Sequence, residues 1–225
     1  MRRGRLARGA TALLARGATA LLARGAAALL ALPAAAGALD CPEGSELRGA
    51  APPAGRKEWC ERPDGVQHGP SLSYHAGGER LALAHFADGE LDGDYREWHA
   101  NGKPALELRY RAGRKEGTER RFDTTGRKQL ETLWKAGRRE GPERSFAPNG
   151  REIGVMTWKA GNLEGPATAW YESGAKRAAG EFRGGARHGR WTSWREDGTK
   201  EKEADFDHGR ELSRHEFPPV GDGVN

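Results

Sequence analysis

The residues that could carry chemistry are two cysteines, seven histidines and a basic segment near the middle of the chain. Cys41 and Cys60 enclose 18 residues rich in glycine and proline. This spacing does not match the CxxC of a redox or metal site, and it therefore predicts a structural disulfide. A bridge that closes a loop of this size stabilises a fold by about 3 kcal/mol in the loop-entropy model.

The histidines form no recognisable ligand or catalytic motif. His68 and His188 occupy the same position in two copies of a repeat that is described below. Other copies carry Asp or Glu at this position, so we interpret both histidines as polar turn residues. The chain contains no HExxH, GxSxG, P-loop or dinucleotide-binding motif. We therefore expect no catalytic residue, no cofactor and no metal ligand, and a chain that binds other molecules without acting on them.

A basic segment extends from Gly113 to Ala160 and holds 12 basic and 7 acidic residues. It predicts either a solvated polar face or a patch for an anionic lipid or glycan. The candidate patch consists of Arg114, Lys115, Arg120, Arg121, Arg127, Lys128, Arg138 and Arg139.

The N-terminus resembles an export signal. Basic residues precede an apolar stretch near Gly25–Leu32, and Ala36-Gly37-Ala38 is a typical cleavage site, so we expect cleavage after Ala38. Arg16 and Arg24 interrupt the apolar stretch, which is too short for a transmembrane anchor. Residues 1–38 also hold six of the 37 basic residues and no acid. Removing them leaves 31 basic and 32 acidic residues, a balance that argues against a nucleic-acid partner.

The strands and turns expected to hold these residues repeat every 24 residues. Gly65, Gly89, Gly113 and their successors to Gly209 set the period, and two further glycines recur at fixed offsets in each copy. One aromatic residue also falls every 12 residues: Tyr74, Phe86, Trp98, Tyr110, Phe122, Trp134, Phe146, Trp158, Trp170, Phe182, Trp194 and Phe206. Such regularity excludes disorder and predicts one structural aromatic per strand, arranged as a ladder.

Alternation within each copy indicates strands rather than helices. Leu106, Leu108 and Tyr110 alternate with charged residues, which is the period of a half-buried strand. Asn101-Gly102 is a hairpin turn signal, and a second turn follows the pattern G-x-x-x-G. We therefore expect an all-β fold in which six hairpins form an elongated antiparallel meander.

This pattern divides the chain into four parts. They are a signal peptide at 1–38, a disulfide-closed N-terminal cap at 39–64, six repeats at 65–209 and a C-terminal tail at 210–225. The charged strand that ends at Phe206 should protect the last edge of the sheet. A single-layer sheet leaves a face uncovered, so a homodimer is one expectation.

The repeats resemble the bacterial variant of the MORN repeat. Its pattern is G-x-x-x-G followed by an aromatic residue, an N-G-K turn and a strand that ends in an aromatic, and the unit that starts at Gly89 follows it. The resemblance extends over 65–209. It implies a β-hairpin repeat fold without fixed catalytic residues. Bacterial relatives include YwqK-type antitoxins, and eukaryotic MORN proteins are associated with membranes, phosphoinositides and protein scaffolding.

Three functions stay open on the sequence. The first is an exported, periplasmic or secreted scaffold that holds a protein partner. The second is an envelope protein that binds anionic lipid or glycan through the basic segment. The third is a cytoplasmic antitoxin-like protein, for which residues 1–38 would not be a signal.

Overall fold

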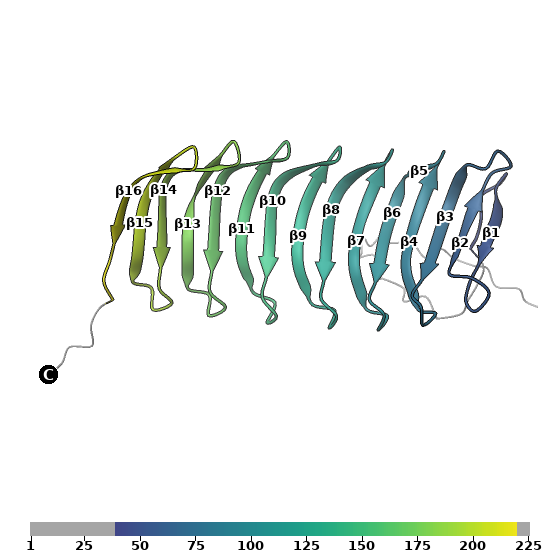
Figure 1. Ribbon diagram of the computed structural model, residues 1–225, viewed down its shortest axis with the longest axis horizontal. Helices are drawn as coiled ribbons and strands as arrows, with labels where there is room; N and C mark the ends of the chain where they lie inside the picture. Colours follow the sequence, from purple (N-terminus) through teal and green to yellow (C-terminus); the bar gives the residue numbers. More distant parts are fainter. Residues whose placement is uncertain (1–38, 220–225) are drawn as a thin grey trace, which may run out of the picture. The chain divides into compact units, whose positions relative to one another are not determined.

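The computed structural model describes residues 39–219, which form one antiparallel sheet of sixteen strands and contain no helix (Figure 1). The expected signal peptide and cleavage site lie outside these residues. The strands are β1 (Glu46–Ala50), β2 (Lys57–Glu61), β3 (Gln67–Tyr74), β4 (Arg80–Ala87), β5 (Glu90–Leu91), β6 (Gly93–Trp98), β7 (Pro104–Arg111), β8 (Arg114–Phe122), β9 (Lys128–Lys135), β10 (Arg138–Phe146), β11 (Glu152–Lys159), β12 (Asn162–Trp170), β13 (Lys176–Arg183), β14 (Ala186–Trp194), β15 (Lys200–Asp207) and β16 (Arg210–Glu216).

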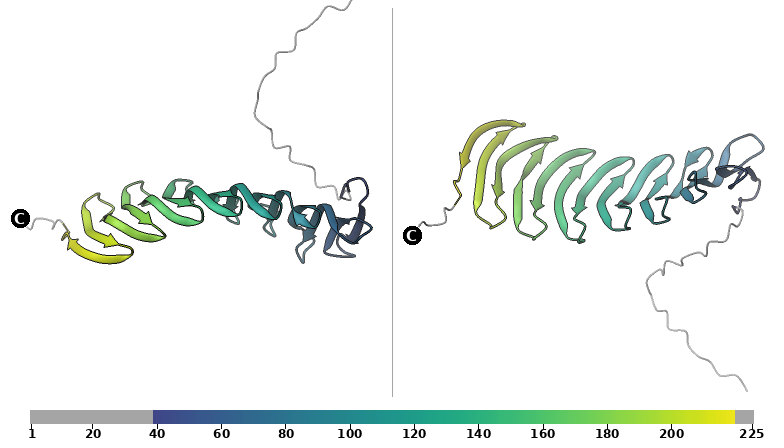
Figure 2. Two further views of the ribbon diagram at one scale, coloured as in Figure 1. Left: turned by 90° about the horizontal axis from the view of Figure 1, so that it is seen from above. Right: turned by 60° about the horizontal axis from the view of Figure 1, so that its bottom comes forward.

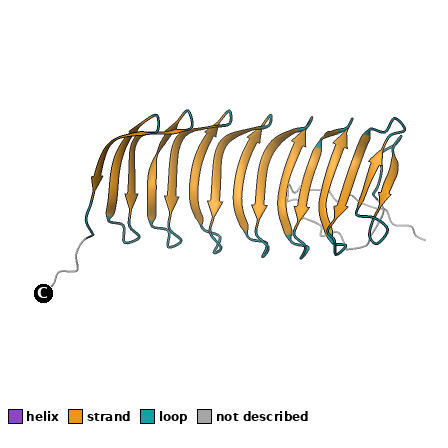
Figure 3. Cartoon of the chain, in the orientation of Figure 1, coloured by secondary structure: helices purple, strands orange, loops and turns teal. Residues whose placement is uncertain are grey.

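The predicted all-β meander is confirmed. Apart from the two-residue β5, which pairs only with β4, each strand pairs with its neighbours in sequence. Figure 3 shows that short turns join the strands along both edges of the sheet. The sheet twists along its length, as Figure 2 shows, which is the usual consequence of strand handedness.

The sheet is longer at both ends than the six repeats predict. β1 and β2 extend it on the N-terminal side, within the region expected to be a cap. Residues Arg210–Glu216, which the pattern assigns to the tail, form β16 and cover the strand that was expected to be the edge. All seven residues of β16 are exposed and four of them are charged, so β16 protects the edge instead.

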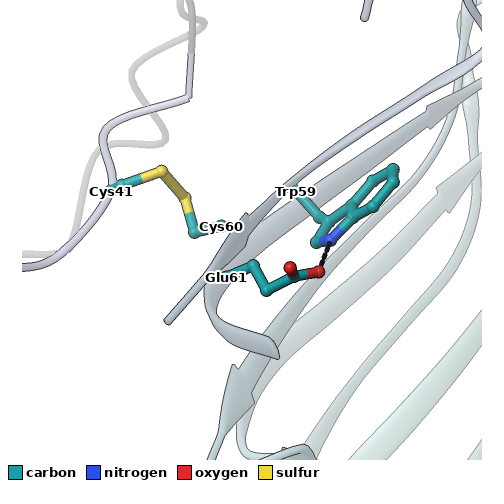
Figure 4. Close-up of a disulfide and its surroundings, with 4 residues drawn as sticks. All are labelled: Cys41, Trp59, Cys60 and Glu61. Atoms are coloured by element: carbon teal, nitrogen blue, oxygen red, sulfur yellow. Dashed lines mark hydrogen bonds between the residues drawn. A yellow bond between two sulfur atoms is a disulfide. The ribbon is translucent and has the colours of Figure 1, made fainter. Parts of the chain in front are cut away.

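The predicted disulfide is confirmed. Cys41 and Cys60 are joined, with Cα atoms 5.5 Å apart, and Cys60 is buried in β2 beside Trp59 (Figure 4). The N-terminal segment crosses β3 at Gly69, where a Cβ atom would lie 2.5 Å from Pro42. The bridge therefore fastens the first residues of the described chain onto the start of the sheet.

Turns of the G-x-x-x-G pattern lie in a row that we call the upper edge, as oriented in Figure 1. Only the first glycine belongs to each turn: Ala112 and Gly113 both have positive φ, as a two-residue type I′ turn requires. The second glycine, Gly117, already lies inside β8, next to an irregularity in its pairing with β7. Gly117 also has positive φ (80°), as the pattern predicts of both glycines, but the turn itself is shorter than G-x-x-x-G.

Five successive turns of the upper edge, from 88–89 to 184–185, are each capped by a side chain of the repeat before. The turn amide of Ala136 donates to Glu116 at 2.8 Å, and that of Ala160 donates to Glu140 at 2.7 Å. Asp92 and Glu164 act in the same way, and His68 Nδ1 accepts from the amide of Asp88 at 3.3 Å. The position shared by His68 and His188 is thus a turn-capping position.

Replacing Glu140 by alanine should lower the free energy of unfolding by about 1 kcal/mol, because the turn amide of Ala160 loses its acceptor. Glu140→Gln keeps an acceptor oxygen and should recover most of that loss. Urea unfolding of both variants checks this. Equal destabilisation by alanine and glutamine would show that the charge, and not the hydrogen bond, stabilises the turn.

The lower edge, formed by the turns at residues 75–79 and their equivalents up to 195–199, is joined across repeats as well. His75 Nε2 lies 2.8 Å from the Trp98 carbonyl, His99 Nε2 lies 3.0 Å from that of Phe122, and Tyr171 donates to that of Trp194 at 2.8 Å. These histidines are therefore structural.

Candidate functional site

The twelve aromatics do not form one ladder, because they lie on opposite faces of the sheet. Lys115 lies over Trp134 and donates to Glu119, whereas Lys128 lies over Phe146 and donates to Glu131. Glu119 and Glu131 point to opposite faces, since Glu131 pairs with Arg120, the residue after Glu119. We call these faces the groove face, which holds Glu119, and the charged face, which holds Glu131.

Most of the core of the sheet is a row along the middle of the groove face, whereas Leu72 and Glu58 are buried on the charged face at the start of the sheet. Register pairing aligns Leu108, Glu119 and Thr132 with Ala167 and Ala204 farther along, and all five are buried. Second-strand aromatics line this row on the side of the upper edge: Phe86, Tyr110, Trp134, Trp158, Phe182 and Phe206. The fold is thus one layer with a thin core.

In the N-terminal half, the groove face neutralises its own charges. Glu119 is 3% exposed and accepts from Lys115 and Arg121, each at 2.7 Å. Burial alone would raise the pKa of Glu119, but these two hydrogen bonds outweigh it and hold the pKa below its usual range. Glu143 likewise accepts from Thr132 at 2.9 Å.

Two tyrosines donate to glutamates near the start of the sheet, Tyr95 on the groove face and Tyr74 on the charged face. Burial and a 2.7 Å hydrogen bond to Glu58 raise the pKa of Tyr74 to about 12. Burial and the hydrogen bond to Glu97 also raise the pKa of Tyr95 above its usual value. The hydroxyls therefore act as hydrogen-bond donors at neutral pH and not as bases.

In the C-terminal half, the groove face is hollow. A groove of about 320 Å³ lies over β10–β14, and its floor consists of small residues such as Ala167 and Ala178. Phe182 and Trp191 form one wall of the groove, and the centroids of their rings are 5.0 Å apart. Gly180 lets Trp191 lie on the sheet, because a Cβ atom there would meet the indole at 2.3 Å.

Among residues 39–219 no acidic side chain lines this groove, and the charged residues that line it are Arg177 and Arg187. Arg187 lies 4.7 Å from the centre of the Trp191 ring and makes no ion pair within residues 39–219. The groove is therefore apolar with a cationic rim.

The charged face carries an alternating ladder. Arg96 faces Glu107, which faces Arg120, and Glu131 lies between Arg120 and Arg144. The Arg120–Glu131 pair is 3.3 Å long and the Arg144–Glu131 pair 3.9 Å. Opposite charges on neighbouring strands stabilise the sheet, and the positive and negative charges of this ladder balance each other.

The structure separates the eight cations of the predicted patch. Lys115, Arg121 and Arg139 lie on the groove face beside Glu119 and Glu143, whereas Arg120 and Lys128 lie on the charged face beside Glu131. Arg127 lies in a turn of the lower edge. Arg114 and Arg138 lie at the upper edge, away from these carboxylates.

The upper edge brings four further cations to Arg114 and Arg138. Arg111 pairs with Arg114 across one turn, and Lys135 pairs with Arg138 across the next. We call the whole set the basic edge: Arg111, Arg114, Lys135, Arg138, Lys159 and Arg183. All six are exposed, and among the described residues none makes an ion pair.

The basic edge has defined ends and aromatic neighbours. It runs from the end of β7 to the end of β13, about 29 Å at the usual strand spacing. The equivalent positions beyond it hold Ala87 and Glu90 on one side, and Asp207 and Arg210 on the other. Four of its cations directly follow groove-face aromatics, namely Tyr110, Trp134, Trp158 and Phe182.

The patch predicted from the sequence contains only two of these six cations, because it consists of residues that are close to one another along the chain. The 24-residue period contained the missing signal: positions two before and one after the leading glycine are basic in consecutive copies.

Comparison with known families agrees with this geometry. Residues 91–112 match the family model of the MORN repeat variant. The matched segment extends from β5 to the end of β7, one complete hairpin, and it supports a MORN-repeat protein. No curated protein matches the chain. A search of residues 39–219 for a helix that could cross a membrane found none.

Proposed function

We propose that this chain is an exported, non-enzymatic repeat protein that rests its basic edge on an anionic lipid surface. The observation that carries the proposal is the basic edge itself: six exposed cations without carboxylate partners, in line along one side of a rigid sheet. Cations near an anionic membrane each contribute roughly 1 kcal/mol to binding.

The aromatics beside the basic edge favour lipid over a soluble glycan. Aromatic rings beside a row of cations suit the interface between lipid head groups and acyl chains. There, one part of the ring contacts water and the other part contacts the apolar chains. A line of charge on an exposed edge also fits a flat surface better than it fits a polymer, which is usually held in a groove. The Cys41–Cys60 disulfide fits export.

Neutralising two cations of the basic edge should weaken vesicle binding about 30-fold, as expected for a loss of about 2 kcal/mol. The variant is Arg114→Gln/Arg138→Gln, tested by flotation with phosphatidylglycerol vesicles. The matched control, Arg127→Gln/Arg177→Gln, removes the same charge near the lower edge. Equal losses in both variants would mean that net charge, and not the basic edge, binds the lipid.

A second candidate function is supported by the groove over β10–β14. Its apolar floor and the unpaired Arg187 fit an extended segment of a protein partner that carries apolar and acidic side chains. The groove and the basic edge use different residues, so one molecule could hold lipid and partner together as a scaffold.

A larger side chain at the floor of the groove tests whether the groove binds a protein partner. Gly180→Val should push Trp191 off the sheet and abolish partner binding while vesicle binding is kept. The measurement is crosslinking pull-down from envelope and cytosolic fractions, with N-terminal sequencing of the bait. A bait that starts at Leu39 would establish export, and a full-length bait trapped with a cytosolic toxin would replace both proposals with the antitoxin alternative.

A further inference from the structure

The last turn of the upper edge departs from the repeat at three positions. His188 occupies the turn-capping position that holds Glu116, Glu140 and Glu164 in the middle repeats. Asp207 stands where four preceding repeats hold a cation of the basic edge. His208 stands where Ala112, Ala136 and Ala160 form the first residue of their turns.

The fold brings these three departures to one point. The ligand atoms of His188, Asp207 and His208 all lie within 4.8 Å of one another. Asp207 Oδ1 lies 2.7 Å from His208 Nδ1 and 3.6 Å from His188 Nδ1, and the two imidazole rings are 5.8 Å apart.

His188 lacks the hydrogen bond that its position makes elsewhere. Its Nδ1 atom is buried and has no hydrogen-bond partner among the described residues. In the first repeat, His68 Nδ1 accepts from the turn amide of Asp88, so a histidine can cap this turn. A buried nitrogen without a partner is costly, and this one points toward two further ligand groups.

We infer that His188, Asp207 and His208 form a binding site for a divalent transition-metal ion of the Zn²⁺ class. Two imidazole nitrogens and one carboxylate suit Zn²⁺, Ni²⁺ or Cu²⁺, whereas Ca²⁺ and Mg²⁺ prefer oxygen ligands. Zinc bonds of roughly 2.0–2.2 Å require these atoms to adjust, and His208 is exposed and therefore has room to rotate. Three protein ligands leave a coordination position for water or for a group from a partner.

The site shares no residue with the basic edge or the groove, so it stands apart from the proposed lipid binding. Thiolates do not compete for the metal, because Cys41 and Cys60 are joined in the disulfide.

The variants for a test come from the chain's own repeats. His188→Glu restores the residue of the middle repeats, and His208→Ala restores that of three other turns, so both should fold. His68→Glu is the matched control, since it makes the same replacement in a turn that lacks a second histidine.

The experiment titrates the chelator-treated full chain with Co²⁺, followed by visible absorbance, and then displaces Co²⁺ with Zn²⁺. We expect one ion per chain, and an affinity that falls at least tenfold in His188→Glu and in His208→Ala but not in His68→Glu. Circular dichroism confirms that each variant keeps its strands. The inference is overturned if wild type binds no Co²⁺, or if the His188→Glu/His208→Ala chain binds it as tightly as wild type does.

Discussion

Reduction of the Cys41–Cys60 disulfide is expected to lower the free energy of unfolding of the N-terminal strands by about 3 kcal/mol. The bridge spans 19 positions and closes a segment rich in glycine and proline that cannot order itself. β1 has four exposed residues out of five, so it contributes little burial of its own. Without the bridge, the residues before β1 lose their attachment to β2.

The effect should be confined to the start of the sheet, because repeat proteins unfold through nearest-neighbour interfaces. Hydrogen exchange of β1–β3 reports this region, and hydrogen exchange of β9–β12 serves as the internal control. Chemical reduction is better than substitution, because it keeps both sulfur atoms and leaves no cavity at the buried Cys60. Uniform loss of protection along the whole sheet would contradict this localisation.

Glu119→Ala should lower the free energy of unfolding by about 3 kcal/mol, at the lower end of the range for breaking a buried ion pair. The side chain lies in the central row of the groove face, and its removal leaves Lys115 and Arg121 close together without their common carboxylate. Both cations are partly solvated, which limits the loss.

The pH dependence separates charge from packing. Because the folded-state pKa of Glu119 is lowered, its contribution is fully present above the ordinary carboxyl pKa of about 4.3 and disappears as the pH falls through the folded-state value. Glu119→Gln keeps the shape and loses the charge. Its stability should therefore be below wild type at pH 7 and converge with it at low pH, and a constant difference would show that packing dominates.

The all-β meander, the hairpin unit and the disulfide could be predicted because local rules fix them. Period-2 alternation fixes strands such as 104–111, and glycine fixes the turns, for example Gly113. β1 and β16 could not be predicted, since they lack the repeat and are held in register only by pairing with β2 and β15.

The face on which each aromatic or charged residue lies depends on irregularities in strand pairing. No residue type in the sequence predicts these irregularities. Trp98 lies on the charged face by alternation with Arg96, and the register shift between Glu97 and Trp98 leaves one extra residue in β7. Tyr110 therefore lies on the groove face, although a constant 12-residue spacing suggests a single ladder. Similarly, the histidines at 188 and 208 are 20 residues apart, and only the antiparallel return of the chain brings them beside Asp207.

The central claim is that the basic edge binds an anionic membrane, and flotation of the wild-type chain with vesicles tests it most directly. Vesicles of phosphatidylglycerol and of neutral phosphatidylcholine are compared as NaCl rises from about 50 to 300 mM, over which the Debye length shrinks markedly. The account predicts binding to the anionic vesicles alone, weakening steeply with salt. Equal binding to both lipids, binding insensitive to salt, or no binding at low salt would contradict it.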